Sequence, residues 1–174
     1  MSPATGATLR WLAELIGARA VAEVGTGAGV SGLWLLRGMT PDGVLTTVDD
    51  EAENSRAARQ TFTEAGIPTQ RVRLITGHPV EVLSRLADGA YDVVFFDANP
   101  QESSRYFEEG LRLLRPGGLV VFNGALLGGR VADPAQRDAA TIAIRALVND
   151  SREDERIRPL LCLLYTSPSP RDRS

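Results

Sequence analysis

The glycine-rich segment at residues 23–31 (EVGTGAGVS) constrains this chain more than any other feature. It follows an apolar run and opens an apolar pattern with helical spacing, which predicts a strand, a tight turn and a helix in succession. Gly25, Gly27 and Gly29 remove three Cβ atoms where the chain turns, and they let backbone amides approach a ligand. The free N–H groups of the following helix point to the same place. We therefore expect this turn to bind a ligand.

A carboxylate follows the next apolar run. Asp49 comes directly after residues 44–48 (VLTTV) and lies about twenty positions beyond Gly29. In a parallel sheet this acid lies beside the glycine turn, where it can accept hydrogen bonds from ribose hydroxyls. The turn and the acid together predict a nucleoside site. The alternatives are a glycine turn without a ligand and an acid that only caps a helix.

The glycine spacing narrows the class of nucleoside. The dinucleotide-binding fingerprint is G-x-G-x-x-G, but this chain has G-x-G-x-G, with Val30 at the position of the third glycine. All nineteen basic residues are arginine, so the chain has no lysine base, and it offers no obvious Tyr/Lys or His group for hydride transfer. A nicotinamide-dependent oxidoreductase is therefore the disfavoured alternative.

The composition indicates a single compact domain. A chain of 174 residues with 43% hydrophobic content can bury a sizeable core. The net charge of −3 provides no basic surface, so nucleic acid is not an expected partner. The sequence contains no long apolar run or signal segment, and its one cysteine excludes an internal disulfide framework. We therefore expect a cytoplasmic protein without a membrane partner.

Apolar runs alternate with amphipathic stretches, which is typical of a parallel sheet with crossover helices. We expect an α/β fold with a doubly wound, mostly parallel, Rossmann-like sheet and helices on both faces. The predicted helices cover residues 4–16, 29–38, 51–65, 79–87, 101–114 and 135–149, and the predicted strands cover 20–24, 43–48, 72–76, 91–96, 118–122 and 157–164. Since the carboxyl ends of parallel strands meet at one edge, Gly25, Asp49, Gly77 and Asp97 should line one crevice.

Several segments in the same order carry a resemblance to a known family. They are residues 2–6 (SPATG), the glycine turn, Asp49, and residues 95–99 (FFDAN), 114–118 (LRPGG) and 129–134 (GRVADP). Over residues 1–160 the chain resembles the class I S-adenosylmethionine-dependent O-methyltransferases of the catechol and caffeoyl-CoA type, especially their small actinobacterial members. The resemblance implies methyl transfer to a hydroxyl of a small, aromatic acceptor. The main alternative is a protein or fragment that binds the cofactor without turnover.

The resemblance also implies roles for single residues. The implied cofactor residues are Met1 at the edge of the site, Glu23, Gly25 and Thr26 for the methionine part with Gly27 in the same turn, Ser31 for the methionine carboxylate, Asp49 for the ribose with Asp50 beside it, Gly77 and His78 for the adenine, and Asn99 as a further contact. Asp97 is the implied catalytic residue, beside the sulfonium and the acceptor. For His78, which precedes Pro79 at a helix start, a cap or surface role is the alternative.

Members of this family activate the acceptor with a divalent cation held by oxygen ligands, and the metal positions depart from that pattern here. The first implied ligand is Asp97, but the Asp-Asn pair of relatives falls on Asn123 and Gly124, so Asn123 is the second. One carboxylate and one amide oxygen would hold Mg²⁺ weakly. Pro100 and Ser103 stand where relatives often have a lysine and a tyrosine. We therefore expect acceptor activation to be impaired or to take another route.

Both ends also depart from the family pattern. Relatives carry a helix before the position that aligns with Met1, so we expect a methyltransferase domain over residues 1–161, truncated at both ends. Residues 162–174 resemble the translated read-through of a transposase adapter, and a natural disordered tail is the alternative. The native C-terminal strand hairpin is then missing, or its last strand is improvised from residues 160–165, which predicts marginal stability. The resemblance also implies a homodimer.

Overall fold

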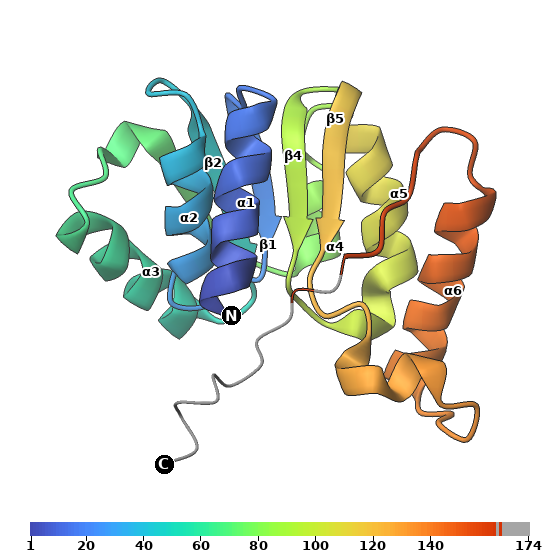
Figure 1. Ribbon diagram of the computed structural model, residues 1–174. Helices are drawn as coiled ribbons and strands as arrows, with labels where there is room; N and C mark the ends of the chain where they lie inside the picture. Colours follow the sequence, from blue (N-terminus) through green and yellow to red (C-terminus); the bar gives the residue numbers. More distant parts are fainter. Residues whose placement is uncertain (163, 165–174) are drawn as a thin grey trace, which may run out of the picture.

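The computed structural model describes residues 1–162 and residue 164 (Figure 1). It contains a five-stranded parallel sheet with the strand order β3-β2-β1-β4-β5. The strands are β1 (Ala20–Val24), β2 (Val44–Asp49), β3 (Val72–Thr76), β4 (Tyr91–Phe96) and β5 (Leu114–Phe122), and the helices are α1 (Pro3–Leu15), α2 (Val30–Gly38), α3 (Ala52–Glu64), α4 (Pro79–Leu83), α5 (Ser103–Leu113) and α6 (Ala139–Glu153). Short 3₁₀ helices are η1 (Thr69–Arg71), η2 (Pro100–Glu102) and η3 (Leu127–Ala132). The predicted doubly wound, parallel sheet is confirmed.

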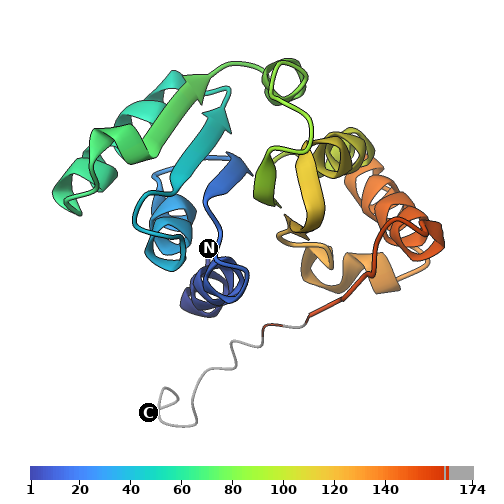
Figure 2. The ribbon, with the colours of Figure 1, turned by 90° about the horizontal axis from the view of Figure 1, so that it is seen from above.

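Helices cover both faces of the sheet, as seen from above in Figure 2. One hydrophobic cluster packs α1, α2 and α3 against alternate residues of the central strands, which include Val21, Leu45, Val93 and Phe95. A second cluster packs α4 and α5 against the other face, where Ala22, Val24, Val94 and Phe96 point. The alternation follows from the period of two in a strand. β4 is buried along its whole length, and Asp97 follows its last residue.

Capping side chains fix the first residues of α1 and α6. The Ser2 side chain accepts a hydrogen bond from the Thr5 N–H at 3.2 Å, and Pro3 occupies the first turn of α1. The Asp138 side chain caps α6 in the same way through the Thr141 N–H at 3.1 Å. α6 packs on the outside of α5 through a third small cluster built on Phe107, Ile144 and Leu147.

Four of the predicted elements that the structure contains differ from the observed ones by more than one residue at an end or by a break. The helix expected at 79–87 ends at Leu83, and α6 covers 139–153 rather than 135–149. The helix expected at 101–114 is divided into η2 and α5. β5 begins at Leu114 rather than at residue 118, because residues 115–118 form an irregularity within the strand, with the pairing shifted between Tyr91 and Val93.

The sixth strand expected at 157–164 was wrong for the residues that the structure describes. Residues 157–162 and 164 form no strand, and all but Ile157 are exposed. Ile157 packs against the cluster between α5 and α6 instead of pairing with β5. Pro159 also lacks the N–H that a ladder needs. Residues 163 and 165–174, which include most of the segment likened to an adapter, lie outside the described part of the chain.

Candidate functional site

Loops from four strands converge at the carboxyl edge of the sheet, the lower edge in Figure 1. Each of the residues that follow these strands donates its backbone N–H to a neighbouring strand end. The bonds are Gly25 to Val48 O (2.9 Å), Gly77 to Asp49 O (3.0 Å), Asp97 to Val24 O (2.9 Å) and Asn123 to Phe96 O (2.9 Å). The structure therefore brings together the four residues predicted to line one crevice, and it adds Asn123.

The glycine turn needs its glycines at specific positions. Gly25, Gly27 and Gly29 have φ values of +93°, +48° and +81°, which side chains rarely tolerate. A Cβ on Gly25 would also lie 2.1 Å from the carbonyl oxygen of Asp97. The turn after β1 thus lies directly against the end of β4.

The carboxylate of Asp49 is fixed by three donors. Gly27 N–H donates to its Oδ2 at 2.9 Å, while Glu51 N–H and Asn54 Nδ2 donate to its Oδ1 at 3.0 Å and 2.9 Å. Asp49 is nearly buried, so these bonds compensate for lost hydration. The sequence prediction missed Asn54, although its place in the first turn of the following helix is a usable signal.

Glu23 is a fully buried carboxylate on β1. The Thr47 hydroxyl donates to its Oε2 at 2.7 Å, and the same hydroxyl lies 2.7 Å from that of Thr26 in the glycine turn. Among the described residues, Oε1 of Glu23 has no hydrogen-bond partner. An unpaired buried acceptor is costly, and so it points to a donor that completes the site.

The surroundings of Glu23 raise the pKa of its carboxyl group. Burial raises the pKa of Glu23 to about 7, and this effect is opposed by the hydroxyls of Ser31 and Thr47. The negative charges of Asp97 and Asp49 raise the pKa further. Ser31 is itself buried at the start of α2, and its contact with the methionine carboxylate stays a prediction.

A cavity of about 180 Å³ opens beside Asp97. It is enclosed by the ends of β4 and β5, by η2 and α5, and by residues from η3 and α6; its lining includes Phe96, Asp97, Pro100, Ser103, Tyr106, Phe122, Asn123, Leu127 and Ile144. Phe96 stacks between Tyr106 and Phe122, with ring centroids 5.1 Å and 4.8 Å apart. The cavity is thus small and largely apolar, with a carboxylate at its wall.

Comparison with known proteins decides the family. The family model described as O-methyltransferase matches residues 1–165. The chain belongs to the O-methyltransferase family. A curated relative from Mycobacterium marinum, whose name places it among O-methyltransferases, is 58% identical over 161 residues, which are 92% of this chain and 72% of the relative. A second relative of that kind, from Mycobacterium avium, is 57% identical over the same length.

Solved structures agree with this assignment. The O-methyltransferase TomG from Streptomyces achromogenes, involved in tomaymycin synthesis and solved in complex with SAM, is 34% identical with a TM-score of 0.84, and the match covers 89% of this chain and 70% of TomG. An O-methyltransferase from Bacillus cereus in complex with SAH is 29% identical, also with a TM-score of 0.84, over 89% of this chain and 71% of that one. Within the described residues, this O-methyltransferase has no helix that is long and apolar enough to span a membrane.

The predicted adenine residues lie beside a polar cluster that the sequence prediction missed. His78 is the N-cap residue of α4 and is half exposed, and its Nε2 lies 3.7 Å from Oε1 of Glu102. The Tyr106 hydroxyl donates to Oε2 of Glu102 at 2.7 Å. Burial, followed by Glu102 and Asp50, raises the pKa of Tyr106 well above its usual range. The signal available in the sequence was the four-residue spacing of Glu102 and Tyr106, which is one helical turn.

The other predicted cofactor residues lie at the same edge of the sheet or near it. Met1 is exposed at the chain start, which lies on this side in Figure 1. Thr26 is buried within the turn, whereas Asp50 is exposed. The Asn99 side chain accepts a hydrogen bond from Gln101 N–H at 3.1 Å, which caps η2. Their contacts with a cofactor stay predictions.

The two predicted metal ligands are neighbours, but they do not form a magnesium site. Nδ2 of Asn123 donates to Oδ1 of Asp97 at 3.0 Å, so the amide presents its N–H group rather than its oxygen to the carboxylate. Mg²⁺ demands near-octahedral oxygen coordination, usually built on carboxylates. Nowhere in the described part of this O-methyltransferase do three His, Cys, Asp or Glu side chains gather closely enough to hold a metal ion. This donor set does not fit the cation that the resemblance implied.

Proposed function

We propose that this O-methyltransferase transfers a methyl group from S-adenosylmethionine to a hydroxyl group of a small, aromatic acceptor. The observation that carries the proposal is the contact between Gly25 and the carbonyl of Asp97. It joins the glycine turn, held by Asp49, to the cavity that Asp97 lines. A nucleoside on the turn and an acceptor in the cavity would therefore meet at one point.

The residues present fit such a nucleoside. Asp49 offers carboxylate oxygens to ribose hydroxyls, and its three internal donors hold it in place for that purpose. The unpaired Oε1 of Glu23 suits a donor from the methionine part. When bound, S-adenosylmethionine supplies an electrophilic methyl group on a sulfonium, whose S–C bond breaks as the acceptor oxygen bonds to carbon.

Asp97 would act on the acceptor directly. Its carboxylate accepts the proton of the acceptor hydroxyl as the oxygen attacks, and it later releases that proton to solvent. The bond from Asn123 orients the carboxylate at the cavity wall. The apolar lining suits an aromatic ring, so positioning supplies much of the rate. The products are the methyl ether, S-adenosylhomocysteine and a proton.

The first test is calorimetric titration with S-adenosylhomocysteine and, separately, with NAD. Binding of the first and not the second supports the proposal; the reverse result would favour the nicotinamide-dependent alternative. A methyl-transfer assay with catechol and caffeate then asks whether binding leads to turnover. The incomplete metal ligand set favours binding without turnover as the second candidate. A cytoplasmic location and a homodimer stay predictions.

A further inference from the structure

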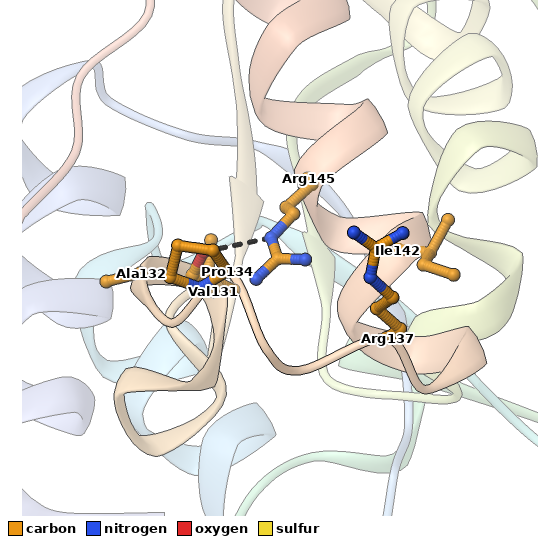
Figure 3. A pocket seen from close by; sticks show the side chains of 6 residues that line it. All are labelled: Val131, Ala132, Pro134, Arg137, Ile142 and Arg145. Atoms are coloured by element: carbon orange, nitrogen blue, oxygen red, sulfur yellow. Dashed lines mark hydrogen bonds between the residues drawn. The ribbon is translucent and has the colours of Figure 1, made fainter.

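A second hollow, of about 440 Å³, lies between α6 and the segment that connects β5 to α6, since both line it. Figure 3 shows the six side chains that line it: Val131, Ala132, Pro134, Arg137, Ile142 and Arg145. The segment includes residues 129–134, the GRVADP stretch to which the proposed chemistry gives no role. The residue that organises it is Arg145 on α6.

Arg145 binds the segment through backbone carbonyls. Its Nε donates to the carbonyl of Val131 at 3.0 Å, the bond drawn in Figure 3, and its Nη1 donates to that of Gln136 at 2.7 Å. Its Nη2 donates to the carbonyls of Arg130 at 3.2 Å and of Asp133. Only a planar guanidinium offers donors in this arrangement, so one side chain holds residues 130–136 together.

The same segment forms part of the acceptor cavity. Leu127, at its start, lines the cavity, and so does Ile144, the residue before Arg145 on α6. Leu127 has a φ of +46°, a conformation that a leucine holds only when its surroundings impose it. Val131 packs in the same hydrophobic cluster as Leu127 and Ile144. Val131 thus links the carbonyl bonds of Arg145 to the apolar wall of the cavity.

We infer that Arg145 is a positioning residue for the acceptor: by holding residues 130–136 on α6, it sets the cavity wall formed by Leu127 and Ile144. This inference rests on the proposed function for the identity of the ligand class. A change at Arg145 should therefore affect acceptor binding and not cofactor binding. The reason is that, among the hydrogen bonds of the described residues, none joins the glycine turn or Asp49 to this segment.

The test compares Arg145→Lys with the matched control Arg137→Lys. Arg137 lines the same hollow, but its guanidinium forms no hydrogen bond or ion pair with the residues that the structure describes. Catechol affinity is measured by calorimetry with S-adenosylhomocysteine present, and hydrogen exchange is followed across residues 124–138. We expect Arg145→Lys to weaken catechol binding about tenfold, since several charge-assisted bonds are lost. Affinity for S-adenosylhomocysteine should stay within twofold of wild type.

Exchange should rise in residues 127–136 of Arg145→Lys and remain at the wild-type level in residues 20–31 and in Arg137→Lys. Unchanged exchange in 127–136 overturns the inference, and so does unchanged catechol affinity in Arg145→Lys. If Arg145→Lys exchanges faster throughout the sheet, Arg145 is needed for the whole fold, and the specific role is wrong. If wild type binds S-adenosylhomocysteine but not catechol, the aromatic acceptor of the proposed function fails. The exchange measurement then decides the role of Arg145 on its own.

Discussion

The backbone N–H of Gly27 donates a 2.9 Å hydrogen bond to Oδ2 of Asp49. The acid that ends β2 therefore holds the turn that leaves β1, although the two residues belong to different strand–helix units. A nucleoside that bonds to Asp49 would contact a group whose position is already set, and so little ordering would be needed on binding.

Replacing Asp49 tests this arrangement. We expect Asp49→Ala to weaken S-adenosylhomocysteine binding by about 10- to 100-fold, the range for losing one hydrogen bond to a charged group. Calorimetric titration measures the change. Asp42→Asn is the matched control, because Asp42 is an exposed carboxylate just before the same strand. Equal affinity in Asp49→Ala and wild type would contradict the nucleoside site.

Gly25 and Gly27 provide a comparison within one turn. Both have positive φ, but a Cβ on Gly25 meets the Asp97 carbonyl, whereas a Cβ on Gly27 meets nothing within 4 Å. We expect Gly27→Ala to cost about 1 kcal/mol, or about 2–4 °C in Tm, for the backbone conformation alone. Gly25→Ala should cost at least about 3 kcal/mol, because the clash adds to the same strain.

Thermal unfolding followed by circular dichroism distinguishes these two variants. The difference in Tm between the two variants, rather than either Tm alone, reports the close approach of the turn to β4. If the two alanine variants melted at the same temperature, the turn would not be packed against the end of β4 as described here.

The sequence was sufficient for the parts of the site that depend on backbone topology. Gly25, Gly77 and Asp97 each follow a strand and Asp49 ends one, and a doubly wound parallel sheet must bring such positions to one edge. Right-handed crossovers and short connections restrict the strand orders that such a sheet can adopt. The whole sheet sets these positions. Errors of a few residues in the predicted helix ends therefore did not change the predicted position of the site at one edge of the sheet.

Side-chain partnerships were beyond the sequence. Arg145 has the spacing of an ordinary surface residue on an amphipathic helix, and its carbonyl acceptors, 9 to 15 residues earlier, leave no mark in residue type. Glu102 and Tyr106 are spaced by one helical turn, but no spacing in the sequence indicates that His78 lies beside Glu102. The sixth strand was predicted from an apolar run alone. That prediction was wrong for the described residues, because a strand also needs a neighbouring strand with which to pair.

Glu23 should make the stability of the ligand-free protein depend on pH. Its pKa is about 7 in the fold against 4.5 as the reference value, so between these limits the folded state binds more protons than the unfolded state. The free energy of unfolding contributed by this group therefore falls as pH rises from about 4.5 to about 7 and stays lowered above that range. Below about pH 4.5, Glu23 is protonated in both states and contributes no pH dependence to the free energy of unfolding.

Glu23→Gln removes this titration while keeping the shape of the side chain. We expect the variant to gain stability relative to wild type as pH rises through the same window, and urea unfolding at several pH values measures the difference. The readout is how the difference in the free energy of unfolding between the variant and wild type changes with pH. A lost hydrogen bond to Thr47 would change that difference by the same amount at every pH. A difference that does not change with pH would show that Glu23 titrates alike in both states.

The pairing of Asp97 with Asn123 predicts how the protein responds to divalent cations. Wild type offers one carboxylate and an amide whose N–H faces it, so Mg²⁺ should show no saturable binding in calorimetry, with S-adenosylhomocysteine present. Methyl transfer should then be insensitive to EDTA. Asn123→Asp places a second carboxylate beside the first, and the repulsion between them is relieved by a cation. We expect this variant to gain Mg²⁺ binding.

Asn123→Ser is the matched control for that gain, because it removes the same amide without adding charge. Mg²⁺ binding in Asn123→Asp and none in Asn123→Ser would show that the missing carboxylate is what separates this site from a metal site. Saturable Mg²⁺ binding by wild type, or activity abolished by EDTA and restored by Mg²⁺, would mean that further ligands complete the coordination. Asp97 would then act through the cation rather than on the acceptor itself.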